Sequence, residues 1–273
     1  MSRRPPAVRH EASGATSAPP RPPITALVLT FNEEANLERV LARLHWAEEI
    51  VVLDSYSTDR TLEIARRHPR VRVEQRPFDN HVDQWNHGLR CVRTPWVLSL
   101  DADYVLSDEL VAELRDQPLE AGAYLASFRY CIGGRPLRGS LYPARVVLFR
   151  TADATYVADG HTQRLQIAAP VRRLSGCIFH DDRKPLAHWL DAQRRYAALE
   201  CAKLTALPDA ALRRTDRVRR LKWLAPLVMP WYCLLGKGLL LDGWPGLYYT
   251  CQRTYFELLL ALELFEHDRH STP

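Results

Sequence analysis

Short apolar runs alternate with amphipathic segments in the first half of the chain, and this alternation restricts the fold more than any other feature. The apolar runs, rich in Val, Ile and Leu, are residues 24–31, 50–53, 71–74 and 96–100. Between the first two runs, Leu37, Val40 and Leu44 recur at helical spacing. Continuous apolar strands separated by helices indicate a mostly parallel sheet with helices on both faces. The sequence therefore predicts an α/β, Rossmann-like fold.

Polar residues at the starts of the predicted helices indicate where each helix begins. Asn32 follows the first run as a candidate N-cap, and Glu33 and Glu34 would occupy the first turn, where carboxylates favour the helix dipole. Ser107 opens a further helical segment in the same way. The other expected helices follow residues 57–59 and cover residues 81–93.

Acidic and amide side chains stand at the ends of three predicted strands. Asn32 and Glu33 follow the first strand, Asp54 ends the second and Asp101 ends the fourth. Open α/β sheets bind ligands beyond the carboxyl ends of their parallel strands. Turns favour Asp, so one such residue would carry little weight, but several at one edge predict a polar crevice.

The segment Asp101-Ala102-Asp103 places two carboxylates two residues apart, directly after an apolar run. In extended backbone both side chains would point to the same side and reach one cation. Carboxylates suit Mg²⁺ or Mn²⁺, which commonly also bind substrate phosphates. An isolated Asp-x-Asp is more often an ordinary acidic turn, so the surrounding residues decide its interpretation.

The turn after the first predicted strand, residues 30–34, lacks the phosphate-binding motifs of two large nucleotide-binding classes. It contains neither Gly-x-Gly-x-x-Gly nor a Walker lysine. This disfavours a dinucleotide-dependent dehydrogenase and a P-loop NTPase. A nucleotide bound here would need its diphosphate neutralised in another way, which a metal ion on Asp101 and Asp103 would supply.

Four short blocks of the sequence are informative through their order and spacing along the chain. They are Thr30-Phe31-Asn32-Glu33-Glu34, Asp54-Ser55-Tyr56-Ser57-Thr58-Asp59, Gln84-Trp85-Asn86-His87-Gly88-Leu89 and Asp101-Ala102-Asp103. Together they resemble the family 2 glycosyltransferases, inverting enzymes of the GT-A fold, over roughly residues 24–200. Ser55 and Tyr56 replace the second Asp and the Gly of that family's second block.

The resemblance implies a role for each matched position. Thr30 and Glu33 would line the nucleoside pocket, and Asp54 would accept a hydrogen bond from a uracil ring. Asp101 would lie near the ribose and the metal, and Asp103 would ligate the metal, Mg²⁺ or Mn²⁺. The donor-binding residues implied are Thr30, Asn32, Glu33, Asp54, Gln84, Asn86 and Asp101.

Three later segments, residues 145–150, 157–163 and 177–180, resemble lipopolysaccharide-core β-1,4-glucosyltransferase-like sequences. Thr162 stands where those sequences have the Glu of a Val-His-Glu motif, so the sugar and the acceptor are not carried over. Inverting transfer needs a base for the acceptor hydroxyl. Asp159 is the first candidate and His161 the second, although Asp-Gly is also a common turn dipeptide. His180 could complete the metal shell, contact the diphosphate or be a structural histidine.

The composition changes after residue 206. Six basic residues stand against one acid, and a Trp- and Tyr-rich apolar segment with two prolines, Pro226 and Pro230, follows directly. The basic residues are Arg213, Arg214, Arg217, Arg219, Arg220 and Lys222. This combination is typical of an interfacial membrane element attracted to anionic headgroups, and a buried helical hairpin with a basic solvent face is the alternative. The prolines are expected to break or kink a helix.

The carboxyl-terminal segment bears on two kinds of partner, nucleic acid and a second copy of the chain. No nucleic-acid-binding module surrounds the basic cluster, so no nucleic-acid partner is expected. A last amphipathic helix over residues 248–265 would pack on the sheet or form the face of a homodimer.

The chain divides into a disordered tail (1–23), a GT-A domain (24–206) and a helical, membrane-associating extension (207–273). The tail is rich in Pro, Arg, Ser and Ala and lacks the apolar region of a signal peptide. No run of 18 or more uncharged apolar residues occurs, and the six scattered cysteines include no Cys-x-x-Cys pair. We expect reduced cysteines and a location on the cytoplasmic face of the membrane, peripheral or monotopic.

The predicted function is metal-dependent inverting transfer of a sugar from a nucleotide-sugar donor, UDP-linked, to a lipid-linked or cell-envelope glycan acceptor. Two alternatives stay open at this point. One is a non-catalytic, membrane-associated nucleotide-sugar-binding protein. The other is a sugar-nucleotide pyrophosphorylase, which usually carries a Gly-rich amino-terminal loop that this chain lacks.

Overall fold

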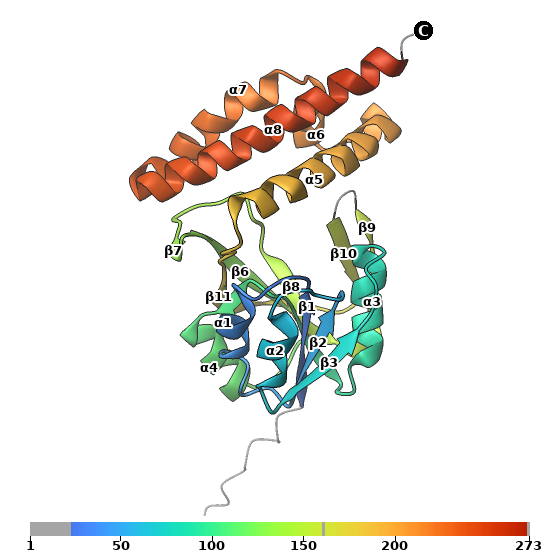
Figure 1. The fold of residues 1–273 in the computed structure, drawn as a ribbon, viewed down its shortest axis with the longest axis vertical. Coiled ribbons are helices and arrows are strands. Elements are labelled where there is room, and N and C mark those ends of the chain that lie inside the picture. Colours follow the sequence, from blue (N-terminus) through green and yellow to red (C-terminus); the bar gives the residue numbers. More distant parts are fainter. Residues whose placement is uncertain (1–22, 160–161, 272–273) are drawn as a thin grey trace, which may run out of the picture.

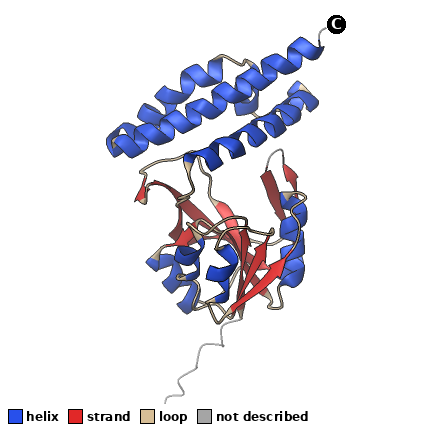
Figure 2. Cartoon of the chain, viewed as in Figure 1, coloured by secondary structure: helices blue, strands red, loops and turns tan. Residues whose placement is uncertain are grey.

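A mixed sheet flanked by helices and a separate helical layer make up the protein (Figure 1). The computed structural model describes residues 23–159 and 162–271, so most of the predicted tail, residues 1–22, lies outside the described residues. In Figure 2 the upper part of the molecule contains helices only, and the strands lie below it. The carboxyl ends of the central parallel strands point toward the helical layer.

The main sheet has the strand order β3-β2-β1-β4-β8-β6-β11-β5, with β7 paired to β6. Its strands are β1 (Ile24–Thr30), β2 (Glu49–Asp54), β3 (Val71–Gln75), β4 (Trp96–Asp101), β5 (Tyr104–Leu106), β6 (Ala123–Ile132), β7 (Arg135–Pro136), β8 (Arg145–Arg150) and β11 (Val171–His180). A separate hairpin joins β9 (Ala154–Asp159) to β10 (Thr162–Ile167). The strands β3, β2, β1 and β4 are parallel, as predicted, whereas β8 and β5 run antiparallel to their neighbours. The predicted α/β fold is confirmed, and the whole sheet is mixed.

Strand β1 is apolar almost throughout because both of its faces are covered. Ala26 and Val28 pack into the core cluster on one face, and Leu27 packs into the cluster on the other. Helices α1 (Leu37–Leu41), α2 (Thr61–Arg66) and α4 (Asp108–Asp116) cover the first face, and α3 (His81–Cys91) covers the second. A Cβ on Gly88 of α3 would lie 2.7 Å from Leu27, so a glycine there lets the helix approach the strand closely.

The predicted N-cap at Asn32 is wrong. Helix α1 begins at Leu37 with Asn36 before it, and Asn32 adopts a left-handed conformation with φ of 52°. Its side chain accepts a hydrogen bond from the Thr58 amide instead of capping a helix. The prediction for Ser107 is confirmed, since its side chain accepts from the Leu110 amide at the start of α4.

The helical layer consists of α5 (Leu186–Ala206), α6 (Arg214–Arg220), α7 (Leu224–Trp231) and α8 (Trp244–Ser271). Apolar residues of α5 and α8, among them Ala197, Phe256 and Leu260, form its core. Pro226 lies in the first turn of α7, where proline is tolerated, so it does not break the helix. Pro230 sits inside α7, and the chain continues as a π-helical turn, Tyr232–Gly236. None of the helices within the described residues contains a stretch long and apolar enough to cross a membrane.

The basic cluster before α7 is divided between the inside and the outside of this layer. Arg219 donates to the buried carboxylate of Glu257 at 2.6 Å and lies 3.5 Å from Glu200, which is also buried. Arg220 binds the backbone carbonyl of Leu204, and Lys222 pairs with Asp268. The exposed members are Arg213, Arg214 and Arg217. Half of the predicted membrane-facing charge therefore holds the helices together.

Candidate active site

The polar residues predicted at the strand ends meet at the carboxyl edge of β1 and β2, the position of the predicted crevice. Thr30 and Asp54 are register partners, and the Thr30 hydroxyl donates to Asp54 Oδ1 at 3.0 Å. Asp54 is fully buried and also accepts from the Ser57 amide (2.9 Å), the Ser57 hydroxyl (2.5 Å) and Gln75 Nε2 (3.2 Å). All four acceptor positions of this carboxylate are thus occupied within the protein.

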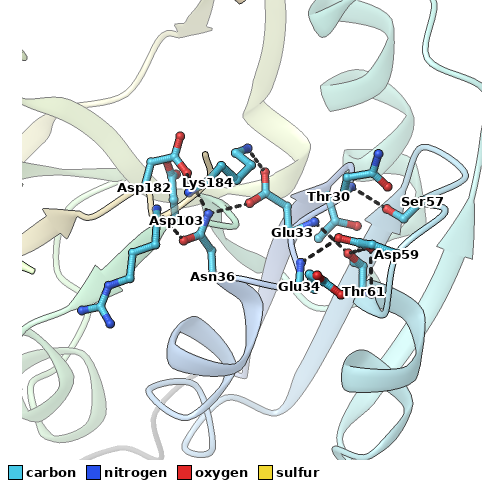
Figure 3. Close-up of polar contacts among 12 residues, drawn as sticks. Thr30, Glu33, Glu34, Asn36, Ser57, Asp59, Thr61, Asp103, Asp182 and Lys184 are labelled. Atoms are coloured by element: carbon cyan, nitrogen blue, oxygen red, sulfur yellow. Dashed lines mark hydrogen bonds and ion pairs between the residues drawn. The ribbon is translucent and has the colours of Figure 1, made fainter. Parts of the chain in front are cut away.

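A second set of contacts fixes the turn that follows β1 against the loop before α2. The Asn32 amide donates to Ser57 Oγ at 2.8 Å, and the Glu33 amide donates to Thr61 Oγ1 at 2.7 Å. Figure 3 shows how these bonds link the two loops beside Thr30. The first two sequence blocks of the resemblance therefore form one hydrogen-bonded surface.

The acidic pair lies where the chain passes between two parts of the sheet. Asp101 is the last residue of β4, and Asp103 stands in the turn before β5. The assumption of extended backbone is wrong here, because a turn and not strand alternation sets the direction of Asp103. The Asp103 carbonyl accepts a hydrogen bond from the Asp181 amide at 3.0 Å, which ties this turn to the end of β11.

His180 pairs with the second carboxylate of that motif. Its Nε2 lies 3.0 Å from Asp103 Oδ2. Burial acts to lower the pKa of His180, but Asp103 outweighs burial and raises it, and His180 in turn holds the pKa of Asp103 below its usual value against the opposing effect of burial. The imidazole is enclosed by the rings of Tyr104, Tyr130 and Tyr142, at centroid distances of 5.2, 4.7 and 4.6 Å.

Lys184 brings a positive charge to the same crevice. Its ammonium donates to Glu33 Oε1 at 2.6 Å, and Asn36 bridges Glu33 Oε2 and Asp182 Oδ1 at 2.8 and 2.9 Å (Figure 3). Burial raises the pKa of Glu33 to about 7, and Asp103 adds to this while Lys184 opposes it. Burial acts to lower the pKa of Lys184, but Glu33 and Asp182 outweigh it and raise that pKa. The rise in the pKa of Lys184 reflects two carboxylates, Glu33 and Asp182, around one ammonium group.

A further ion pair anchors the segment that carries Lys184. Arg39 of α1 donates to Asp181 Oδ2 at 2.6 Å and to the Asp181 carbonyl at 2.8 Å. The Gly134 amide donates to the other oxygen of this carboxylate at 3.2 Å. The segment between β11 and α5 is therefore held from both the amino-terminal half and the β6–β7 turn.

Asp101 and Asp103 have the ligand chemistry of a divalent-metal site. Within residues 23–159 and 162–271, no three His, Cys, Asp or Glu side chains are grouped as a complete metal site. Asp101 and Asp103 still offer two carboxylates, and Mg²⁺ commonly takes one or two carboxylates with phosphate and water in its remaining positions. Nδ1 of His180 is buried without a hydrogen-bond partner among the described residues. The metal roles of all three residues stay predictions.

The other predicted donor-site residues, Gln84 and Asn86, have different partners. Gln84 donates to Ser55 Oγ at 3.1 Å and accepts from Arg76 at 2.9 Å, so it borders the crevice. Asn86 is paired with the backbone of Tyr156 through both its amide nitrogen and its oxygen, and so holds β9 against α3. Asp159 ends β9, but its side chain and all of His161 lie outside the described residues.

Sequence reasoning missed the contribution of α1 and of the segment after β11. Asn36, Arg39 and Lys184 were not among the predicted site residues, yet they surround Glu33 and Asp181. The only signal was the charged run that follows His180. A run of charges does not show which helix it contacts, so the pairing of residues 151 positions apart could not be read from it.

Comparisons with known proteins match the chain to one family. Residues 25–162 match the sequence model of glycosyl transferase family 2. An uncharacterized glycosyltransferase of Rickettsia bellii is 36% identical over 92 residues, 33% of this chain and 31% of the relative. The lipopolysaccharide core biosynthesis glycosyltransferase LpsC of Rhizobium meliloti is 30% identical over 115 residues, 40% of this chain and 42% of LpsC. The chain thus spans less than half of the length of these curated relatives.

Solved structures give more distant matches. The mannosyltransferase PcManGT from Pyrobaculum calidifontis, in complex with GDP-Man and Mn²⁺, matches with a TM-score of 0.49 at 15% identity, over 93% of this chain and 89% of that one. S. aureus TarS 1–349 in complex with UDP-GlcNAc matches with a TM-score of 0.45 at 16% identity, over 90% of this chain and 92% of that one.

Proposed function

The chain belongs to glycosyl transferase family 2, and we propose that it transfers a sugar, with inversion, from a nucleotide-sugar donor to a lipid-linked or cell-envelope glycan acceptor. One observation carries this proposal. Asp101 ends β4 beside Leu29 of β1, so the acidic motif lies at the same carboxyl edge as the hydrogen-bonded Thr30–Asp54 pair, and Lys184 is close enough to Asp103 to act on its charge. Parallel α/β sheets bind their ligands at this edge.

The residues of the crevice divide the work of holding a UDP-linked donor. Asp101 and Asp103 would hold a Mg²⁺ or Mn²⁺ ion, which when bound acts as a Lewis acid on the departing diphosphate. Lys184 adds a positive charge on the same side, buried enough to act at low screening. Thr30 and the turn at Asn32 form the wall on which the nucleoside would lie.

The acceptor hydroxyl needs a base as it attacks the anomeric carbon. Asp159, at the end of β9, remains our first candidate and His161 our second. Strand β9 lies against α3, because the Tyr156 ring stacks on Trp85 with centroids 5.3 Å apart and the backbone of Tyr156 is bonded to Asn86.

Two observations support the proposed class of acceptor. The relative LpsC is named for lipopolysaccharide core biosynthesis, and a lipopolysaccharide is a glycan joined to a lipid. In addition, the helical layer exposes ten large apolar side chains between residues 224 and 247, which we call the apolar face. It consists of Leu224, Leu227, Val228, Trp231, Tyr232, Leu235, Leu240, Leu241, Trp244 and Leu247, each more than 40% exposed.

We place the apolar face on the cytoplasmic surface of a membrane, as a peripheral or monotopic contact. Exposed apolar patches of this size mark interaction surfaces. The exposed residues Arg214 and Arg217 precede the face along the chain and would meet anionic headgroups. Trp231 and Trp244 suit the boundary between headgroups and acyl chains.

The donor part of the proposal is tested by thermal shift with UDP, GDP and dTDP, each with Mn²⁺, with Mg²⁺ and with EDTA. A ligand that binds only the folded state raises the melting temperature in proportion to its occupancy. We expect one nucleotide to stabilise the protein with metal and to lose most of that effect in EDTA. Stabilisation that is equal with and without metal would remove the metal from the proposal. Nucleotide-sugar binding without turnover on any acceptor would favour the non-catalytic alternative.

A further inference from the structure

A cavity of about 520 Å³ lies between the sheet and the helical layer. Its walls come from the β6–β7 turn, from the segment after β11, and from the starts of α5 and α8 (Figure 1). The lining residues that matter here are Tyr130, Asp182, Lys184, Trp189, Trp244 and Tyr248. None of these aromatic residues belongs to the four sequence blocks of the donor site.

One wall of the cavity is shared with the donor crevice. Tyr130 packs on the His180 ring at 4.7 Å, and His180 is bonded to Asp103. Lys184 lines the cavity while its ammonium binds Glu33. A group bound in the cavity would therefore be separated from Asp103 by two side chains, Tyr130 and His180.

The opposite wall is continuous with the apolar face. Trp244 belongs to both, since it lines the cavity and is 55% exposed. Tyr248, one helical turn later on α8, packs edge-on against Trp244 with ring centroids 6.4 Å apart. Leu240 and Leu241, just before this helix, are 61% and 70% exposed. The cavity thus has Lys184 of the charged cluster on one side and an exposed apolar surface on the other.

The chemistry of the lining is that of a carbohydrate site. Its volume falls within the range of small-molecule pockets. Trp189, Trp244 and Tyr248 offer ring faces for the C–H faces of a sugar and also polar N–H or O–H groups. Asp182 and Lys184 provide a carboxylate and a cation for hydroxyl groups or a phosphate.

We propose that this cavity binds the sugar headgroup of a lipid-linked acceptor, with the lipid leaving along the apolar face. The inference rests on the proposed function and names the place and the amphiphilic class of its second substrate. The polar end of the acceptor would reach the metal side past Tyr130, and its lipid would remain in contact with Trp244 and the leucines beside it.

The test uses octyl β-glucoside below its critical micelle concentration as the probe, with methyl β-glucoside and 1-octanol as the separate head and tail. Binding is measured by saturation-transfer NMR, which reports the ligand protons that contact the protein. We expect saturable binding of octyl β-glucoside with transfer to its sugar protons, and a weaker signal for either part alone. Trp244→Ala and Tyr248→Ala should each raise its Kd about fivefold, as the loss of an aromatic contact predicts.

Trp223→Ala is the matched control. Trp223 is 59% exposed, as Trp244 is 55% exposed, but it packs on Phe265 near the far end of α8, roughly 30 Å along the helix from Trp244. It should leave the Kd unchanged. No saturable binding, equal binding of 1-octanol, or an equal loss in Trp223→Ala would overturn the proposal, because each would indicate at most a nonspecific apolar surface.

Donor binding separates this inference from the function on which it depends. The melting-temperature shift caused by UDP with Mn²⁺ should be the same in Trp244→Ala and in the unmodified protein. An unmodified protein that turns over no nucleotide sugar but binds octyl β-glucoside as described would overturn the proposed function and leave the cavity assignment. Sugar transfer with an unchanged KM for the acceptor in both aromatic variants would overturn the cavity assignment alone.

Discussion

The sheet and the helical layer differ in where their polar and their exposed apolar residues lie. In the sheet, apolar residues fill both faces, and polar residues such as Asp54 gather at one edge. The helical layer has an apolar core between α5 and α8, a buried ion pair between Arg219 and Glu257, and large apolar side chains exposed on its outside. The sheet edge is therefore suited to a polar ligand, and the exterior of the helical layer is suited to apolar surroundings.

The largest expected effect tests whether the edge of the sheet is a metal-dependent donor site. Asp103→Asn removes one of the two charges on which the proposed metal depends. We expect sugar transfer with Mn²⁺ to fall by roughly 10³-fold, a loss of several kcal/mol of transition-state stabilisation. Radiolabelled transfer assays and donor thermal shifts measure this change, and the melting temperature without ligand checks that the fold is intact.

Asp153→Asn is the control for that variant. Asp153 is an exposed carboxylate of the 3₁₀ turn Thr151–Asp153, outside the crevice, so transfer should be unchanged. Full activity of Asp103→Asn, or full activity of the unmodified protein in excess chelator, would contradict the metal role. Either result would remove the metal-dependent function that distinguishes the sheet edge from the helical layer.

The parts of the molecule that could be predicted are those fixed by local pattern. Apolar runs bounded by turn residues gave β1 to β4, and the register of these parallel strands brings Thr30 to Asp54 as the strand-end argument requires. Ser107 caps its helix as expected, because capping depends on the next three residues only.

The parts that could not be predicted depend on contacts between distant segments. Lys184 reaches Glu33 only because the end of β11 lies next to the turn before α1. Asn32 does not cap a helix because hydrogen bonds to Ser57 and Thr58 hold it in the loop after β1. The sequence showed a basic cluster after residue 212, but not that Arg219 would turn inward to two buried glutamates.

The second prediction concerns the inside of the helical layer. Arg219→Ala leaves Glu257 and Glu200, both nearly inaccessible, without their main cation. Removing one partner of a buried pair is strongly destabilising, and we expect a loss of about 3 kcal/mol in the free energy of unfolding. Arg217→Ala, an exposed arginine on the same helix, should change it by less than about 0.5 kcal/mol in urea titrations. Equal effects would show that the layer does not depend on its buried charges.

The third prediction is a pH dependence that should belong to the sheet edge and not to the helical layer. Burial raises the pKa of Glu33 from its ordinary value of 4.5 to about 7, so its contribution to stability is complete below pH 4.5 and is lost as the pH rises through 7. The loss amounts to about 2–3 kcal/mol. Urea titrations at pH 5 and pH 8 should show that decrease in the unmodified protein and a smaller one in Glu33→Gln. His180 is present in both proteins, so its titration cancels in the difference, and identical pH slopes would contradict the assignment.

The smallest expected effect tests the outside of the helical layer. Leu227 of the apolar face is 67% exposed, and Leu227→Ser should weaken binding to vesicles of phosphatidylglycerol and phosphatidylcholine about fivefold, since less apolar area enters the interface. Leu199→Ser, at a 51% exposed leucine of α5 outside this face, is the matched control and should bind as the unmodified protein does. Vesicles of phosphatidylcholine alone should bind more weakly, because the exposed arginines then lack anionic headgroups.

Light scattering without vesicles tests the alternative partner of the apolar face, which is a second copy of the chain. A dimer that Leu227→Ser dissociates, together with unchanged vesicle binding, would assign the apolar face to self-association and remove the membrane from the comparison between the two regions.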